Sequence, residues 1–263
     1  AFPHRARAMM SLDAAMQLAF LLFCRLGGMA LVTPLLASRS VPAKLRLCML
    51  VAFTVVLFPV ARAAALPGAT VTPATFVTET VTGFAIGLGS ALVIAAAQAA
   101  GDVMAVQIGL QGASVLDPMT NVQVPTLGQF MTAFTTLLLL AAGGHLLMLD
   151  AVAETLRVVP PGSALDVTAS LGAMARAGGE LLSLGVLFAA PAIAATMLAN
   201  IVLGLLVKAA PAMNLLAVAF PLQIGAGLVT IGAALALTAS WFSTWDQRQW
   251  GWLERLVGPM TGG

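Results

Sequence analysis

The chain alternates long apolar runs with shorter polar connections. An α-helix needs about 20 apolar residues to cross the hydrocarbon of a membrane. Runs of that length occur at about residues 14–37, 46–66, 76–100, 127–149, 181–207 and 214–240, and we expect each to form a long helical segment. The pattern therefore predicts an all-α, multi-pass membrane-type protein with about six long apolar helical segments.

Composition supports this prediction and excludes several classes of function. Charged residues occupy 8% of the 263 positions, whereas roughly a quarter of the residues of a soluble domain carry a charge. The net charge of +2 is too small to indicate nucleic-acid binding. Cys24 and Cys48 both lie in apolar runs, and the sequence contains no Cys-x-x-Cys metal motif. We expect neither a metal nor any other cofactor.

Glycines and prolines within the runs predict close helix packing and bent helices. Gly83 and Gly87 have the G-x-x-x-G spacing, which lets two helix backbones approach closely. A proline inside a span frees a backbone carbonyl, which must then be satisfied by protein or water. We therefore expect kinked hairpins around five of the prolines that lie in or beside the runs, namely Pro34, Pro42, Pro191, Pro211 and Pro221.

Several polar side chains lie where a span would bury them. Placing a charge in hydrocarbon costs roughly 2.5–3.5 kcal/mol, so such a group must face protein, water or the interface. Arg25 has long apolar flanks on both sides, and we predict that it is buried and paired with an acidic or carbonyl group within an assembly. For His145 we favour a hydrogen bond at a helix end over a proton relay or a metal site. The others are Gln98, Asp102, Glu180, Asn200 and Lys208.

Enzyme chemistry has little support. The motifs G-x-S-x-G and H-E-x-x-H are absent, as are nucleotide-binding fingerprints. Asp102 lacks a second aspartate in a matching run, which an intramembrane aspartyl protease would need. A small-solute transporter is an alternative, but such folds are built from two similar halves, and the first three segments do not visibly repeat in the last three.

One connection is unusual for this chain. Residues 107–130, QIGLQGASVLDPMTNVQVPTLGQF, are rich in Gly, Gln, Ser, Thr and Asn and hold a single charge, Asp117. Long loops without secondary structure are uncommon unless they are functional. Irregular backbone at membrane depth is tolerated only within protein or beside a water-filled cavity. An ordinary surface connector is the alternative.

Four blocks of sequence, in order, resemble the FliR family of flagellar export-apparatus proteins, which is related to the injectisome proteins called SctT. They are CRLGGMALVTPLLASRSVPAKLRL (24–47), GDVMAVQIGLQGASVLDP (101–118), GGHLLML (143–149) and NIVLGLLVKAAPAMNLLAVAFPLQIGAGL (200–228). The resemblance covers about residues 20–235. The family's usual glycine before Phe-Pro is Ala219 here. The Gly-His element and the Q-x-G-L form favour the flagellar branch, with the equivalent injectisome subunit as the alternative.

The resemblance implies a core subunit of the type III export gate, which forms a gated conduit with FliP and FliQ and carries out no chemistry. It implies one export-gate domain, residues 1–263. Residues 1–170 would be a FliP-like part that includes a plug loop, and residues 171–263 a FliQ-like hairpin with a Trp-rich tail. It also implies a location in the bacterial inner membrane at the flagellar basal body. FlhB would lie near the C-terminus, and unfolded export substrates would pass in transit.

The resemblance assigns roles to two sets of residues. The plug of the family matches residues 107–125, where glycines allow movement and aliphatic side chains offer an apolar seal. The implied plug residues are Gln107, Ile108, Gly109, Leu110, Gln111, Gly112, Val115, Leu116, Asp117, Pro118 and Met119. The residues expected to serve assembly and packing, from their own patterns or from the resemblance, are Arg25, Pro34, Pro42, Arg46, Gly83, Gly87, His145, Asn200, Gly204, Pro211, Asn214 and Pro221.

The C-terminal tail holds every tryptophan of the chain. Trp241, Trp245, Trp250 and Trp252 are interleaved with charged residues. This pattern is typical of a helix at the membrane interface, and a helix that binds a partner is the alternative.

Overall fold

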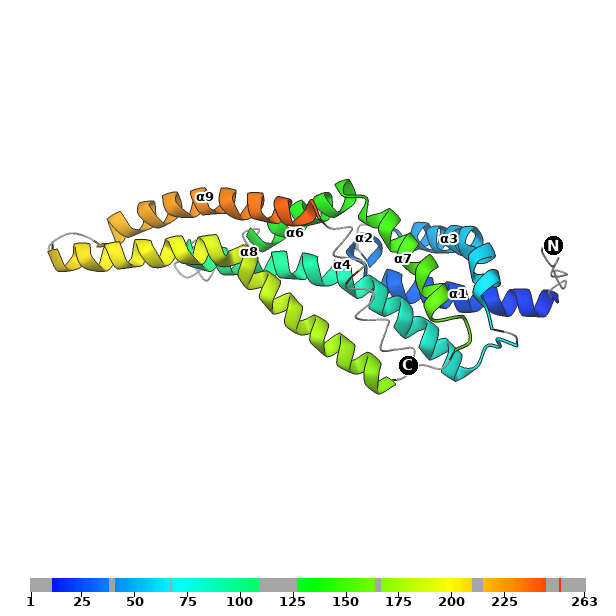
Figure 1. Cartoon of the computed structure of the whole chain (residues 1–263). Helices are drawn as coiled ribbons and strands as arrows, with labels where there is room; N and C mark the ends of the chain where they lie inside the picture. The colour runs from blue at the N-terminus through cyan, green and yellow to red at the C-terminus, as the bar shows by residue number, and fades with distance from the viewer. Residues whose placement is uncertain are drawn as a thin grey trace, which may run out of the picture. The chain divides into compact units, whose positions relative to one another are not determined.

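The structure is a computed structural model that describes residues 11–37, 41–66, 68–108, 127–163, 167–209, 215–244 and 251. Helices dominate this part of the chain, which contains no strand, so the all-α prediction is confirmed (Figure 1). The helices are α1 (Leu12–Val32), α2 (Pro34–Ala37), α3 (Ala43–Ala64), α4 (Pro73–Gln107), α6 (Leu127–Ala141), α7 (Gly144–Val158), α8 (Val167–Ala209) and α9 (Leu215–Phe242).

Five of the described helices are long and apolar enough to cross a membrane, and a sixth span results if α6 and α7 are taken together. The multi-pass prediction is therefore confirmed, but the single segment expected at 127–149 is wrong. The chain breaks after Ala141, and Gly143 adopts a φ of +72°, a left-handed conformation that interrupts a right-handed helix. The third segment continues to Gln107 instead of ending near residue 100.

Local chemistry explains where the first and fourth helices begin. Ser11 accepts a hydrogen bond from the Ala14 N–H (3.3 Å) at the start of α1. At the start of α4, the Thr72 hydroxyl accepts from the Thr75 N–H (3.1 Å) and the Thr75 hydroxyl accepts from the Thr72 N–H (2.8 Å). Pro73 then occupies the first helical position, where a missing N–H costs nothing. Prolines also lie inside α3, α8 and α9, at Pro59, Pro191 and Pro221.

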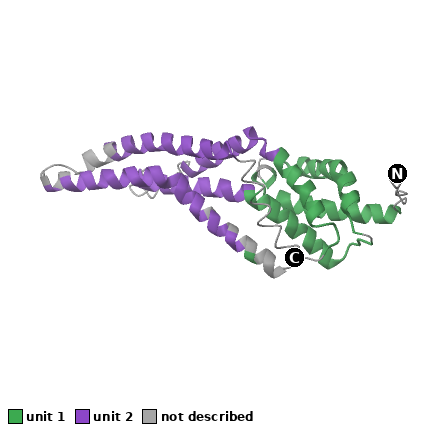
Figure 2. Cartoon of the chain, viewed as in Figure 1, with its two compact units in different colours: residues 1–89, 146–174, 249–263 green, residues 90–145, 175–248 purple. Residues whose placement is uncertain are grey.

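The chain forms two compact units (Figure 2). Unit 1 comprises residues 1–89, 146–174 and 249–263, and unit 2 comprises residues 90–145 and 175–248. Unit 1 therefore contains α1, α2, α3 and all but the first two residues of α7, whereas unit 2 contains α6 and α9. Residues of α4 and α8 belong to both units. The division expected near residue 170 rests on likeness to other subunits and stays a prediction.

Unit 1 packs around α1, which crosses α4 at very short range. The leucines at 18, 21, 22 and 26 of α1 are almost fully buried. A Cβ on Gly28 would collide with the backbone carbonyl of Thr80, and a Cβ on Gly83 would collide with the backbone of Arg25. The partner helix of Gly83 and Gly87 is thus α1 of the same chain. Glycine is required because backbone faces backbone at this crossing.

Unit 2 has its own core, which joins four helices. α4, α6, α8 and α9 all contribute to it. Phe188 is completely buried, and its ring packs edge-to-face against Trp241 with centroids 5.9 Å apart. In addition, α8 and α9 are tied together by a hydrogen bond from Gln223 Nε2 to Asn200 Oδ1 (3.1 Å). The core residues are Ala97, Ala100, Met104, Ile108, Met131, Phe188, Ala189, Ala192 and Ala234.

Candidate functional site

The strongest polar arrangement in unit 1 surrounds Arg25 in the middle of α1. Its Nε lies 2.7 Å from Glu79 Oε2, and both side chains are fully buried. Its Nη2 donates to the Val159 carbonyl (2.8 Å), and its Nη1 lies 3.5 Å from the Thr155 hydroxyl. The other Glu79 oxygen accepts from the Gly162 N–H (3.3 Å). We refer to Arg25, Glu79, Thr155, Val159 and Gly162 as the Arg25 cluster.

The Arg25 cluster connects segments that are distant in the sequence. Arg25 comes from α1, Glu79 from α4 and Thr155 from α7, while Val159 and Gly162 lie in the connection between α7 and α8. A buried charge is stable only when it is paired and hydrogen-bonded, and this pair meets both conditions. Two fully buried groups that neutralise each other favour a structural role over catalysis.

The apolar flanks of Arg25 predict its burial but do not identify its partner. Arg25 is the single charged residue of the run 14–37, and Glu79 is the single charged residue of the run 76–100. Two lone opposite charges in separate spans are a signal that they pair, because each is costly alone. The structure also shows that the partner belongs to the same chain, whereas we expected it somewhere in the assembly. A role for Arg25 in assembly stays a prediction.

In unit 2, the end of α4 and the start of α6 meet where the predicted plug loop leaves and returns. A Cβ on Gly101 would lie 2.7 Å from the Gly128 Cα and 2.8 Å from the Leu127 carbonyl oxygen. A Cβ on Gly128 would collide with the half-buried carboxylate of Asp102. The two helices therefore cross backbone to backbone, and glycine is needed on both sides. The sequence pattern had singled out neither Gly101 nor Gly128 as a packing residue.

The predicted plug residues fall into two groups. Gln107 is the last residue of α4, and Ile108 follows it with only 1% of its surface exposed, within the core of unit 2. Ile108 therefore packs inside this chain, and its part in an apolar seal stays a prediction. The remaining plug residues lie outside the described residues: Gly109, Leu110, Gln111, Gly112, Val115, Leu116, Asp117, Pro118 and Met119.

The structure separates the other predicted packing residues. Pro34 begins α2, Pro42 precedes the first residue of α3, and Arg46 lies half-buried in the first turn of that helix. Asn200 bonds α9, as described above, whereas a Cβ on Gly204 would meet open space. Pro211 and Asn214 lie outside the described residues, as do three of the four tryptophans.

His145 lies apart from these groups. It is the second residue of α7 and is exposed. The expected hydrogen bond at the helix end is not seen within the described part of the chain. No group of three or more potential metal-binding side chains occurs among the described residues either.

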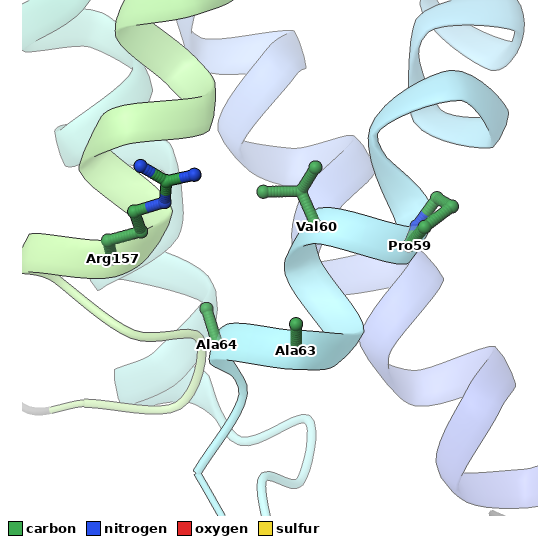
Figure 3. Close-up of a pocket in the computed structure, with 5 residues that line it drawn as sticks. All are labelled: Pro59, Val60, Ala63, Ala64 and Arg157. Carbon is green, nitrogen blue, oxygen red and sulfur yellow. The ribbon is translucent and has the colours of Figure 1, made fainter.

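A groove of about 530 Å³ lies in unit 1 between the ends of α3 and α7 (Figure 3). Arg157 projects from α7 towards it, and Pro59, Val60, Ala63 and Ala64 line it from α3. The guanidinium of Arg157 already donates to Glu154 one turn earlier (3.1 Å). The five lining residues offer one exposed, paired cation and otherwise apolar surface, so we assign no chemistry to this groove.

The geometry of the described residues thus consists of helix crossings and a buried ion pair. Residues 16–247 match the sequence family described as bacterial export proteins, family 1. Over 215 residues the chain is 31% identical to the flagellar biosynthetic protein FliR of Escherichia coli K12, covering 78% of this chain and 79% of that protein.

The chain belongs to the FliR family. It is also 31% identical to the flagellar biosynthetic protein FliR of Pectobacterium carotovorum over 155 residues, 59% of each chain. The FliR protein of Bacillus subtilis is 27% identical over 159 residues, covering 58% of this chain and 60% of that one. As a member of the FliR family, the chain is a membrane-embedded structural subunit of the flagellar export apparatus. The family match includes both the Arg25 cluster and the α4–α6 crossing.

Proposed function

We propose that this FliR-family chain is a core subunit of the flagellar type III export gate. With FliP and FliQ it forms a gated conduit through which unfolded substrate proteins leave the cell during flagellum assembly. Its place is the inner membrane at the base of the flagellum, and it works by packing and movement. The family match over residues 16–247 is the observation that carries this proposal.

The surface of α8 and α9 supports assembly with other helices. A Cβ at Gly178, Gly179, Gly204, Gly225 or Gly232 would meet nothing within 4 Å. Lipid gives no reason to place glycine on a surface, whereas a neighbouring helix does, because small residues let backbones approach. A groove of about 470 Å³ runs between the two helices, with small residues such as Ala199 and Ala226 in its lining. We infer that this hairpin, within the FliQ-like residues 171–263, receives helices of other subunits.

We further propose that residues 107–125 close the conduit until substrate arrives. Support comes from the two ends of this stretch, which are both fixed in unit 2. Ile108 is buried in the core, and Gly128 crosses α4 at Gly101. Between these points the sequence is nearly uncharged and rich in glycine and amides. Such a segment can fill a pore without holding an ion there.

The Trp-rich C-terminal tail is proposed to lie near FlhB, either at the membrane interface or against that partner. Trp241 belongs to the end of α9 and packs on Phe188 and Phe242. The other tryptophans lie outside the described residues. Cross-linking from a photoreactive residue at Trp250 in whole cells distinguishes a protein neighbour from lipid.

Deleting Gly109–Ser114 from the complex of this chain with FliP and FliQ tests the proposal. The helices carry the packing, so we expect the deletion variant to co-purify with both partners. Cells that make the deletion variant should leak small ions. The leak is measured as membrane conductance, as slower growth or as uptake of a dye. A variant with six glycine or serine residues in place of 109–114 is the matched control for length. A correctly assembled deletion complex without any rise in leak would show that the stretch is only a connector.

A further inference from the structure

At the end of α4, an isoleucine packs directly against a glycine of α9. Ile108 is 1% exposed and belongs to the core of unit 2. A Cβ on Gly227 would lie 2.8 Å from Ile108 Cδ1 and would collide with both of its γ-carbons. Any side chain larger than hydrogen at residue 227 therefore excludes Ile108 from its present position.

Two other glycines of α9 show that this is a property of one position and not of the helix. Gly225 and Gly232 are exposed, and a Cβ on either would meet nothing within 4 Å. The first lies two residues from Gly227 and the second five residues away. Only at residue 227 does the absence of a side chain correspond to a contact with the end of α4. These neighbours therefore provide matched controls on the same helix.

Ile108 has little freedom to move aside. It is β-branched, so its γ-carbons lie close to the backbone and its first side-chain torsion is restricted. Its surroundings in the core, including Met104 and Met131, are fully buried. Closely packed interiors have few voids that could accept a displaced side chain. A methyl group at residue 227 must consequently shift either α9 or the last turn of α4.

We propose that Gly227 is a positioning residue for the export path, because it seats Ile108 and so fixes the end of α4 against α9. This inference rests on the proposed function, since the residues that follow Ile108 are those proposed to close the conduit. A movement of the α8–α9 hairpin, which we expect to contact other subunits, would be passed to the end of α4 through this contact. Two discrete packings of such a contact are the physical requirement for coupling between distant parts.

Cysteine labelling of the purified complex tests whether the contact between Ile108 and Gly227 holds the end of α4 in place. The background carries Cys24→Ala and Cys48→Ser. Met104→Cys reports on the buried face of α4 one turn before Ile108, and Val106→Cys, at a position 59% exposed in this chain alone, is the comparison site. We expect Gly227→Ala to raise the labelling rate at residue 104 towards that of residue 106. Gly225→Ala and Gly232→Ala should leave residue 104 protected. If the cysteine at residue 104 is labelled no faster in Gly227→Ala than in these two controls, Gly227 does not position the end of α4.

A size exchange makes the same test in cells and guards against loss of folding. Ile108→Ala removes the three atoms that would lie nearest to a methyl group at residue 227. We expect Gly227→Ala to reduce assembly or motility, and the double variant Gly227→Ala with Ile108→Ala to perform better than Gly227→Ala alone. A double variant that is as defective as the sum of its single variants overturns the proposal. A loop deletion without leak would refute the proposed plug, yet the labelling result would stand separately.

Discussion

Replacing Arg25 with leucine would leave the Glu79 carboxylate buried without its counter-ion. In the native chain this carboxylate receives Arg25 Nε at 2.7 Å and the Gly162 N–H at 3.3 Å. After the substitution only the weaker hydrogen bond from Gly162 remains. The Val159 carbonyl also loses its donor, because Arg25 Nη2 no longer reaches it. We expect unit 1 to lose much of its stability and the export complex to assemble poorly.

The size of the effect follows from burial. Both side chains of the pair have 0% exposure, and removing one partner of a buried ion pair typically costs about 3–5 kcal/mol. A whole domain is stable by only about 5–15 kcal/mol, so this loss is severe. Replacing both partners, in Arg25→Leu with Glu79→Met, removes the orphaned charge. The Val159 carbonyl and the Gly162 N–H then both lack their partners. An unsatisfied buried group costs about 1–3 kcal/mol, so the double variant should recover only part of the stability.

A second ion pair of the same chain provides the control. Arg157 and Glu154 are joined at 3.1 Å on α7, but their side chains are 69% and 48% exposed. Exposed pairs contribute about 0–1 kcal/mol. Arg157→Leu makes the same chemical change as Arg25→Leu and should be almost silent. The assay is the yield of the complex with FliP and FliQ, together with its thermal aggregation midpoint in detergent and the swimming radius of the cells.

The test is the order of the four proteins in complex yield and in aggregation midpoint. We expect the highest values for wild type and Arg157→Leu, lower values for the Arg25–Glu79 double variant, and the lowest values for Arg25→Leu. Equal yield and equal midpoint for Arg25→Leu and Arg157→Leu would contradict this prediction, because the buried pair would then contribute no more than an exposed one. A double variant worse than Arg25→Leu would show that the cost comes from packing volume and not from the orphaned charge.

Two further predictions concern glycines. On α1, Gly28→Ala should block close packing because its Cβ would collide with the Thr80 carbonyl. Gly27→Ala should be tolerated because its Cβ would meet nothing within 4 Å. The yield of the complex measures both effects, and equal yields would contradict the close crossing of α1 and α4. At the break between α6 and α7, Gly143→Ala should lower stability by about 1–2 kcal/mol because of its φ of +72°. Gly143→Asn should cost less, since asparagine tolerates this conformation, and an alanine variant with the midpoint of the asparagine variant would argue against strain.

The arrangement of elements along the chain was largely determined by the sequence. A run of about 20 apolar residues without charge can satisfy its backbone in lipid only as a helix or a closed barrel, so span positions follow from local composition. The four ordered blocks were sufficient to identify the family. The sequence was less informative where one glycine acts against a helical pattern: the run 127–149 is apolar throughout, yet Gly143 divides it.

Only the tertiary structure decided which residues meet. The sequence placed one lone charge in each of two runs, but pairing of Arg25 with Glu79, 54 positions apart, depends on how α1 and α4 cross and rotate. The same is true of glycines. The sequence does not distinguish Gly27 from Gly28, yet a Cβ on Gly27 would meet open space and a Cβ on Gly28 would meet the Thr80 carbonyl. Ile108 looked like part of a loop and is core, because α4 extends to Gln107 and α9 brings a glycine against it. Local composition determines where each helix forms. The contacts of each residue depend on how the helices cross and rotate, which involves residues far apart in the sequence.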